Sequence, residues 1–205
     1  VRRTVRYARN QGVSSFAALV PKGGYGERTS ETLISEVRAA GGTLLAMESF
    51  DRSRPSISAA ATKLRARGDF DAVLIADSGS LSAHAASVLK TRGSASPRLL
   101  GTELWSGEKA ITTTPALNDA WFSAVSDARF PQFVNSYRTR FGAAPYRIAT
   151  LGYDAVLLTL RVARDWTPGK TFPAASLTSA DGFLGLDGAF RFNKNGVIER
   201  ALEVR

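Results

Sequence analysis

The chain has 205 residues, of which 44% are hydrophobic, so it can bury a sizeable core and is not disordered as a whole. It contains no cysteine, which excludes disulfide bridges, thiol nucleophiles and cysteine metal sites. Its net charge is +9 at pH 7, and it has no apolar run of the roughly 18 residues that a membrane-spanning helix needs.

Basic residues are dense at the start of the chain, and residues 1–26 contain no acidic residue. The basic residues there are Arg2, Arg3, Arg6, Arg9 and Lys22. Such a positive field attracts anionic partners, including nucleic acid. However, basic residues continue along the whole chain, and no zinc finger, RNA-binding aromatic strand or heptad-linked basic helix is present. We therefore interpret the charge as solvated helix faces and expect no nucleic-acid partner.

In the first half, short apolar runs alternate with segments of helical periodicity. The predicted helices are residues 4–11, 27–40, 56–67 and 81–92, and the predicted strands are residues 16–20, 43–50, 71–76 and 98–101. Repeated strand–loop–helix cycles predict a parallel sheet covered by helices on both faces. Parallel strands joined by right-handed crossovers all end at the same edge of the sheet, so the loops that follow them meet there, where open α/β sheets bind ligands.

After Trp105 the regular strand–loop–helix alternation ends. Residues 120–124 form a short extended run, and two helices are predicted, over residues 128–141 and 147–165. Residues 188–192 and 197–204 then predict the two strands of a hairpin, because the Asn-Gly of the intervening turn accepts a positive φ. The fold class predicted is therefore α/β, with an open, mostly parallel sheet flanked by helices on both faces and a C-terminal β-hairpin.

A search for catalytic or metal chemistry finds little. The single histidine, His84, has no His, Cys or carboxylate partner at a spacing that a metal site or a proton relay uses. The glycine-rich loop 22–26 is followed by Glu27-Arg28, where a phosphate-binding loop needs Lys-Ser/Thr, and Thr29 replaces the third glycine of a dinucleotide fingerprint. We therefore expect no enzyme activity, no metal and no cofactor.

Polar and aromatic residues follow three of the predicted strands. The candidate ligand-binding residues are Tyr25, Asp77, Ser78, Glu103 and Trp105. Hydroxyls and helix N–H groups suit a carboxylate, Glu103 suits an ammonium group, and the rings suit an apolar body, so the set predicts a small polar or zwitterionic ligand. Each residue also has a structural interpretation: Ser78 or Ser80 as a helix cap, Glu103 as an exposed charge, and Trp105 as part of the core.

Four motifs, taken in order, carry a resemblance to a known family. They are RLLGTE at residues 98–103, FGAAP at 141–145, GYDA at 152–155 and GLDGAFRF at 185–192. Together they resemble the type I periplasmic binding proteins, the branched-chain amino-acid receptor kind. Within that family, GTELW at 101–105 and DGAFRF at 187–192 resemble the branch of penicillin-binding protein activators, which are outer-membrane lipoproteins.

The resemblance implies a two-lobed, hinge-bending protein of which this chain is a part. Residues 1–118 correspond to the second-lobe α/β domain, residues 119–182 to the crossover and helices of the first lobe, and residues 183–205 to a hairpin returning to the second lobe. The first-lobe sheet is expected to precede Val1, so the chain looks trimmed. Helices without that sheet expose apolar faces, which favours a homo-oligomer of the chain.

By position, Tyr25 and Glu103 match the aromatic and acidic ligand contacts of these receptors, whereas Ser78 stands where they often carry an aromatic residue. The first hypothesis is a non-catalytic extracytoplasmic protein that binds a small polar or amino-acid-like ligand between two lobes, with an ABC transporter permease as one partner that would bind its closed form. The alternative is an activator-like lipoprotein that regulates a peptidoglycan synthase by protein contact. Both imply a periplasmic, lipid-anchored parent. A DNA-binding repressor shares the fold but needs a helix-turn-helix, which this chain lacks.

Overall fold

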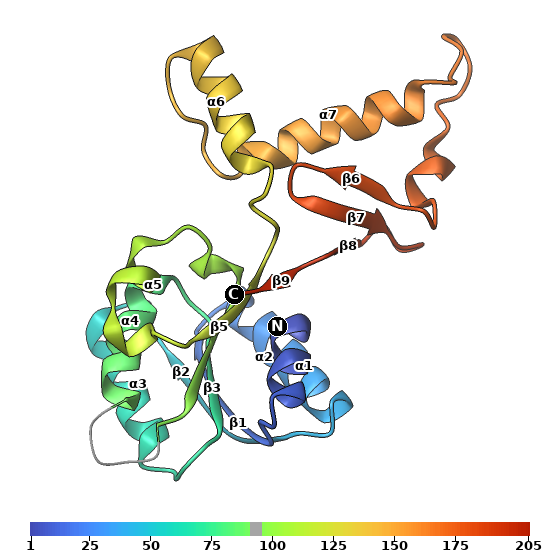
Figure 1. Cartoon of the computed structure of the whole chain (residues 1–205). Helices are drawn as coiled ribbons and strands as arrows, with labels where there is room; N and C mark the ends of the chain where they lie inside the picture. Colours follow the sequence, from blue (N-terminus) through green and yellow to red (C-terminus); the bar gives the residue numbers. More distant parts are fainter. Residues whose placement is uncertain (91–95) are drawn as a thin grey trace. The chain divides into compact units, whose positions relative to one another are not determined.

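The computed structural model describes residues 1–90 and 96–205, which form two compact units. The first unit comprises Val1–Ala124 together with Val204–Arg205, and the second comprises Val125–Glu203. Figure 1 traces both units in sequence colours. Each unit has its own sheet, so each is described separately below.

The first unit is built on a six-stranded sheet with the order β2-β1-β3-β4-β5-β9. Its strands are β1 (Ser15–Pro21), β2 (Thr43–Phe50), β3 (Ala72–Ile75), β4 (Arg98–Gly101), β5 (Trp121–Ala124) and β9 (Glu203–Val204). The pairs among β1 to β5 are parallel. At the β5 edge, Phe122 and Arg205 exchange two backbone hydrogen bonds of 2.9 Å, which is the pattern of an antiparallel pair.

Helices cover both faces of this sheet (Figure 1). They are α1 (Arg2–Asn10), α2 (Gly24–Ala39), α3 (Arg54–Arg65) and α4 (Gly79–Leu89). In β1, Phe16 and Ala18 pack with residues of α1 and α2, whereas Ala17 and Leu19 pack with residues of α3 and α4. Because successive strand residues point to opposite faces, a strand buried on both sides is apolar throughout. The predicted mostly parallel, doubly covered sheet is confirmed.

Helix α2 begins at Gly24, earlier than the predicted start at residue 27. The reason lies at Gly26, where a Cβ atom would overlap the carbonyl group of Pro21. Only glycine lets the first turn of α2 pack directly on the end of β1. As a result Tyr25 lies immediately beside the end of that strand. Helix α4 also begins earlier than predicted, and residues 91–92 at its predicted end lie outside the described residues.

Short helices connect β4 to β5, which the sequence pattern did not predict. They are η1 (Glu103–Trp105), α5 (Lys109–Thr113) and η2 (Pro115–Leu117). The side chain of Thr102 starts the first of them by accepting a hydrogen bond from the Leu104 N–H at 3.4 Å. Leu117 and Trp105 from this connection are buried in the same cluster as α3 and α4, so the connection completes that face of the core.

The second unit contains α6 (Phe130–Phe141), α7 (Ala149–Ala163), η3 (Ala174–Thr178) and a three-stranded antiparallel sheet. Its strands are β6 (Phe183–Gly185), β7 (Gly188–Phe192) and β8 (Ile198–Arg200). The predicted hairpin turn is confirmed: the Asn193 side chain accepts the N–H groups of Asn195 and Val197, and Gly196 has a φ of 75°.

The predicted hairpin differs from the structure in two respects. The sequence did not predict β6, and a single strand over residues 197–204 is wrong. Strand β8 ends at Arg200, and the chain then leaves the hairpin so that β9 pairs with β5. The physical reason is that Glu203–Val204 is too short to carry an alternating pattern, so its pairing depends on where the tertiary fold takes it.

A buried polar network links α7 to the β6–β7 turn within the second unit. Arg147 Nη1 donates to Asp187 Oδ1 at 2.7 Å, and Thr150 Oγ1 donates to the other oxygen of Asp187 at 2.9 Å. Asp154 Oδ1 accepts the Leu186 N–H at 2.7 Å. These carboxylates are buried, and a buried carboxylate is tolerated when hydrogen bonds and opposite charges surround it.

The second unit also exposes many large apolar side chains. On and beside α6 and α7 these are Phe141, Tyr146, Ile148, Leu151, Tyr153, Val156, Leu157 and Leu160. In this unit, Val162 is the only buried hydrophobic residue that α7 contributes to the small core with Phe183 and Phe190. Among the described residues, no helix is long and apolar enough to cross a membrane.

The arginines of α1 have partners within the first unit. Arg2 and Arg6 approach the buried Glu36 at 2.5 and 3.7 Å, and Arg9 donates to the carbonyl oxygens of Ala40 and Val13. Three of the four arginines in this helix therefore hold α1 against its neighbours. This arrangement supports the structural interpretation of the basic N-terminal segment.

Asp71 joins the first residues of two neighbouring strands. Its Oδ2 accepts the backbone N–H groups of Ser14 and Ser15, both at 2.8 Å, while its own N–H donates to Ser15 Oγ at 2.9 Å. The N–H groups of Ser15 and Ser14 hold the pKa of Asp71 below its usual value, because they favour the charged carboxylate.

We predict that Asp71→Asn lowers the free energy of unfolding by about 1 kcal/mol at pH 7, a modest value because the carboxylate is exposed. The folded pKa lies below the unfolded value of about 4, so the contribution is complete above that value and is lost as the pH falls through the folded pKa. Urea unfolding between neutral and acidic pH should show the two proteins converging in acid. A difference that persists in acid would contradict this assignment. Asp69→Asn is the matched control.

Candidate functional site

The carboxyl ends of the parallel strands bring several polar side chains to one edge of the first unit. Tyr25 follows β1, Asp77 follows β3, and Thr102 follows β4. The Tyr25 hydroxyl donates to Thr102 Oγ1 at 3.0 Å, although the two residues are far apart in sequence. The loops after β1 and β4, which were predicted to meet at one edge, are therefore in direct contact. We call the loops that follow β1, β2, β3 and β4 at this edge the carboxyl rim.

Arg52 connects Tyr25 to Asp77 across the carboxyl rim. It follows β2, and its Nε lies 3.1 Å from Asp77 Oδ2. Its guanidinium carbon lies 5.7 Å from the centroid of the Tyr25 ring, within the range of a cation–π contact. Arg52 was not among the residues predicted from the sequence. The available signal was its position, because it follows a strand of the same parallel sheet.

Asp77 is almost completely buried, with 4% of its surface exposed. Its Oδ1 accepts the Ser78 N–H at 2.7 Å. Its Oδ2 receives no hydrogen bond of normal geometry from the described residues, so the contact with Arg52 is mainly electrostatic. A buried carboxylate with one oxygen that accepts no hydrogen bond needs a nearby positive charge, because an uncompensated charge is costly to bury.

Ser78 caps helix α4. Its Oγ accepts the Leu81 N–H at 3.4 Å, which is the role that a serine at the start of a helix commonly has. The neighbouring Ser80 N–H donates to Glu108 Oε2 at 3.0 Å. Two of the N–H groups that open α4 are thus engaged by the chain itself, which leaves fewer of them for a ligand carboxylate. Glu108, like Arg52, was not predicted from the sequence.

Trp105 lies in the core beneath the carboxyl rim, with 1% of its surface exposed. Its indole N–H donates to the carbonyl oxygen of Asp77 and to Ser82 Oγ, both at 3.0 Å. The ring packs so closely on Gly101 that a Cβ atom there would overlap it. The structure therefore places Trp105 where it fixes the backbone of Asp77, whereas Glu103, two residues earlier, is exposed.

Among residues 1–90 and 96–205, no group of three or more His, Cys, Asp or Glu side chains is arranged to hold a metal ion. His84 lies within α4 and is half-buried. The groups that the carboxyl rim offers are an aromatic ring, hydroxyls, carboxylates and one guanidinium. These groups suit non-covalent recognition of a small polar molecule.

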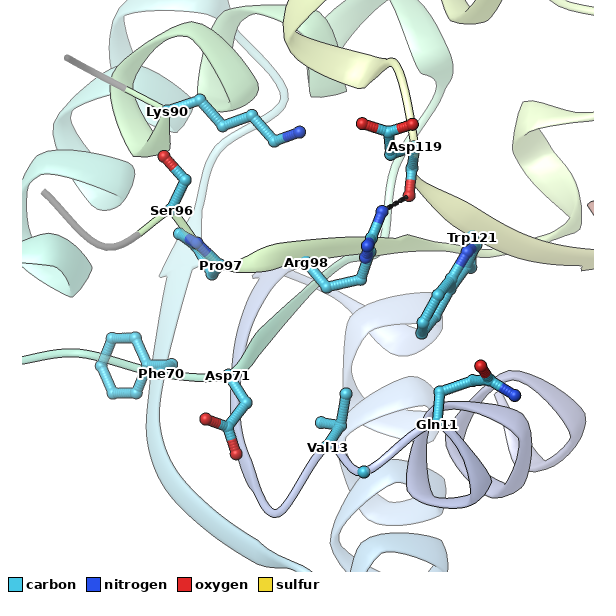
Figure 2. A pocket seen from close by; sticks show the side chains of 11 residues that line it. Gln11, Val13, Phe70, Asp71, Lys90, Ser96, Pro97, Arg98, Asp119 and Trp121 are labelled. Atoms are coloured by element: carbon cyan, nitrogen blue, oxygen red, sulfur yellow. Dashed lines mark hydrogen bonds between the residues drawn. The ribbon is translucent and has the colours of Figure 1, made fainter.

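A cavity of about 580 Å³ lies at the opposite edge of the sheet, where the strands begin. Figure 2 shows Arg98 reaching the carbonyl oxygen of Asp119, at 2.5 Å, beside the ring of Trp121. The Arg98 guanidinium also stacks on that ring at 4.5 Å, and Lys90 Nζ donates to the Asn118 carbonyl at 3.2 Å. The cationic groups of this cavity thus have partners within the chain, so we centre the candidate site on the carboxyl rim.

Comparisons with known proteins agree with this geometry. A family model described as periplasmic binding protein matches residues 1–204. A solved structure described as a putative branched-chain amino acid ABC transporter from Rhodospirillum rubrum is 21% identical, with a TM-score of 0.85, and covers 99% of this chain and 61% of its own. No curated protein matches the chain.

Two further solved structures have the same fold. A leucine binding protein from Thermotoga maritima is 18% identical, with a TM-score of 0.71, and covers 99% of this chain and 61% of its own. A solute binding protein of an ABC transporter from R. palustris, in complex with benzoate, is 20% identical, with a TM-score of 0.69, and covers 100% of this chain and 58% of its own. This chain therefore spans about 60% of the length of the structures it matches.

The contact between Tyr25 and Thr102 gives a direct test of the carboxyl rim. Tyr25→Phe and Thr102→Val should each destabilise the chain by about 1 kcal/mol, and the double variant by less than their sum, with a coupling of about 0.5–1 kcal/mol. Urea unfolding of the four proteins measures this coupling. Tyr146→Phe, at a side chain that is 87% exposed, is the control. Strict additivity would show that the two side chains do not interact.

Proposed function

This chain belongs to the periplasmic binding protein family, and on that premise we propose that it provides the carboxyl rim with which a non-catalytic, extracytoplasmic protein binds a small solute. The observation that carries the proposal is the convergence of Tyr25, Arg52, Asp77 and Thr102 at the edge where open α/β sheets bind ligands. The family's own description supports a location outside the cytoplasm.

The ligand class that we propose is a small polar or amino-acid-like molecule held between two lobes of the longer protein. Glu103 would face its ammonium group, and the Tyr25 ring would contact a neighbouring part of the solute. Ser78, whose hydroxyl caps α4, offers no aromatic surface, so the ligand is expected to be small on that side. Trp105 contributes by holding the Asp77 backbone in place and does not face the ligand.

Closure of the two lobes around the solute would shift an equilibrium between open and closed forms, and a membrane permease would bind the closed form. The descriptions of the R. rubrum and R. palustris structures name ABC transporters, which supports a permease of that class as the partner. The division into residues 1–118, 119–182 and 183–205, the lipid anchor, and self-association through the exposed face of α6 and α7 stay predictions.

No observation favours the alternative of a penicillin-binding protein activator. None of the matches reported above is described as such a protein. The two motifs that suggested it, at residues 101–105 and 187–192, also have structural roles: Trp105 lies in the core, and Asp187 binds Arg147 and Thr150. We therefore do not extend the proposal to peptidoglycan synthases.

The longer protein is expected to gain thermal stability with a member of a panel of L-amino acids and small aromatic carboxylates. At a ligand concentration about 100 times Kd the gain is about 2.7 kcal/mol, which raises the Tm of a protein of the relatives' length by roughly 4 °C. Tyr25→Ala together with Glu103→Gln should abolish the shift, whereas the exposed control Tyr146→Ala should retain it. Catalytic turnover of a panel member, or a shift that the rim variants leave unchanged, would overturn the proposal.

A further inference from the structure

Asp77 and Tyr25 form the walls of a small subsite that the chain's own Arg52 occupies. The guanidinium lies against a buried carboxylate oxygen on one side and over an aromatic ring on the other. An aromatic face combined with a carboxylate is the pair of groups with which proteins bind organic cations, because both attract positive charge. The chemistry of this subsite is therefore specific for a cation.

The two walls are fixed. Asp77 is oriented by the Ser78 N–H at its other oxygen and by the Trp105 indole at its backbone. Tyr25 is held by its hydroxyl on Thr102 and by the close packing of Gly26 on β1. The subsite therefore persists when its occupant leaves, and the buried Asp77 carboxylate still requires a positive charge.

Arg52, in contrast, is weakly held. Its side chain is 54% exposed, and its contact with Asp77 Oδ2 lacks the geometry of a normal hydrogen bond. The half-exposed guanidinium loses little when it leaves for water, whereas the buried Asp77 carboxylate carries the cost of losing a positive charge. The loop that carries Arg52 is anchored independently, because Ser56 Oγ accepts the Asp51 N–H at 3.0 Å and Ser53 caps α3. The side chain can therefore leave the subsite without unfolding the loop.

We propose that Asp77 and Tyr25 form a subsite for an ammonium or guanidinium group of the solute, and that Arg52 fills this subsite when no solute is bound. The proposal rests on the solute-binding function proposed above and adds to it the chemical class of one part of the solute. Binding exchanges one cation for another, so the buried Asp77 carboxylate is never left uncompensated. An organic cation must also compete with Arg52 for the subsite. Cations that bind the subsite more weakly than the Arg52 guanidinium therefore do not displace it.

A different role for Arg52, as the receptor of a solute carboxylate, gives the opposite result on substitution. If Arg52 received an anion, its removal would weaken anion binding and would create no affinity for cations. If Arg52 is a replaceable occupant, its removal opens a site for added cations. Chemical rescue of an arginine variant distinguishes the two roles.

The experiment uses Arg52→Ala in the 205-residue chain, with methylguanidinium and methylammonium as probes and sodium chloride at equal ionic strength as the salt control. Arg52→Ala should lower Tm by roughly 3–6 °C, because it leaves Asp77 without its cation. Either organic cation at about 20 mM should then restore at least half of that loss in a saturable manner. Stronger rescue by one probe identifies which cation the subsite prefers.

The control variant is Arg52→Ala combined with Asp77→Asn, which removes the charge that the probes would meet. It should show no saturable rescue beyond that of sodium chloride. Equal responses of the two variants, or no response of Arg52→Ala, would overturn the proposal. If Arg52→Ala does not fold alone, recovery of soluble, folded protein in methylguanidinium gives the same readout.

A second measurement uses the unmodified chain. Methylammonium should shift the side-chain Nε–H resonance of Arg52 in an NMR titration as the guanidinium leaves the subsite, and an unchanged Arg52 resonance at saturation would contradict the exchange. Both experiments need only the first unit's residues and simple cations. A failed solute screen of the longer protein therefore leaves them interpretable, and a failed rescue leaves the solute-binding proposal standing with a different subsite.

Discussion

The parallel pairing of the strands constrains this chain more than any single contact does. Because β1, β2, β3 and β4 run in the same direction, the loops that follow them are all found at the same edge of the sheet. Two close backbone approaches then set the positions of side chains at that edge. Gly26 lets α2 start on the end of β1, and Gly101 makes room for the Trp105 ring under the loop after β3. Without these, Tyr25 and Asp77 would not have fixed places at the rim.

Much of the fold was predictable because burial on both faces leaves a plain signal. Strands such as Ala72–Ile75 are apolar at every position, and the Asn-Gly turn identifies the hairpin by its need for a positive φ. The strand β9 was not predictable, because two residues carry no pattern and its partner β5 is distant in sequence. Local sequence thus predicts elements well, and predicts the pairing of very short strands poorly.

The candidate site was predictable in its location and less so in its details. Tyr25 and Asp77 were identified because they follow strands, whereas Arg52 was missed because its role depends on the reach of a long side chain between two loops. Trp105 shows the opposite difficulty: an indole after a strand suggests a ligand contact, but the space left by Gly101 lets it turn into the core. Ser78 had two interpretations, and the hydrogen bond to Leu81 N–H shows that it caps α4.

The most direct test of the proposed solute site is a crystal structure of the longer protein with a stabilising solute bound. We predict solute atoms within about 4 Å of the Tyr25 ring and the Asp77 carboxylate, with the Arg52 guanidinium displaced from between them. A solute bound instead at the opposite edge of the sheet, in the cavity beside Arg98 and Trp121, would contradict it.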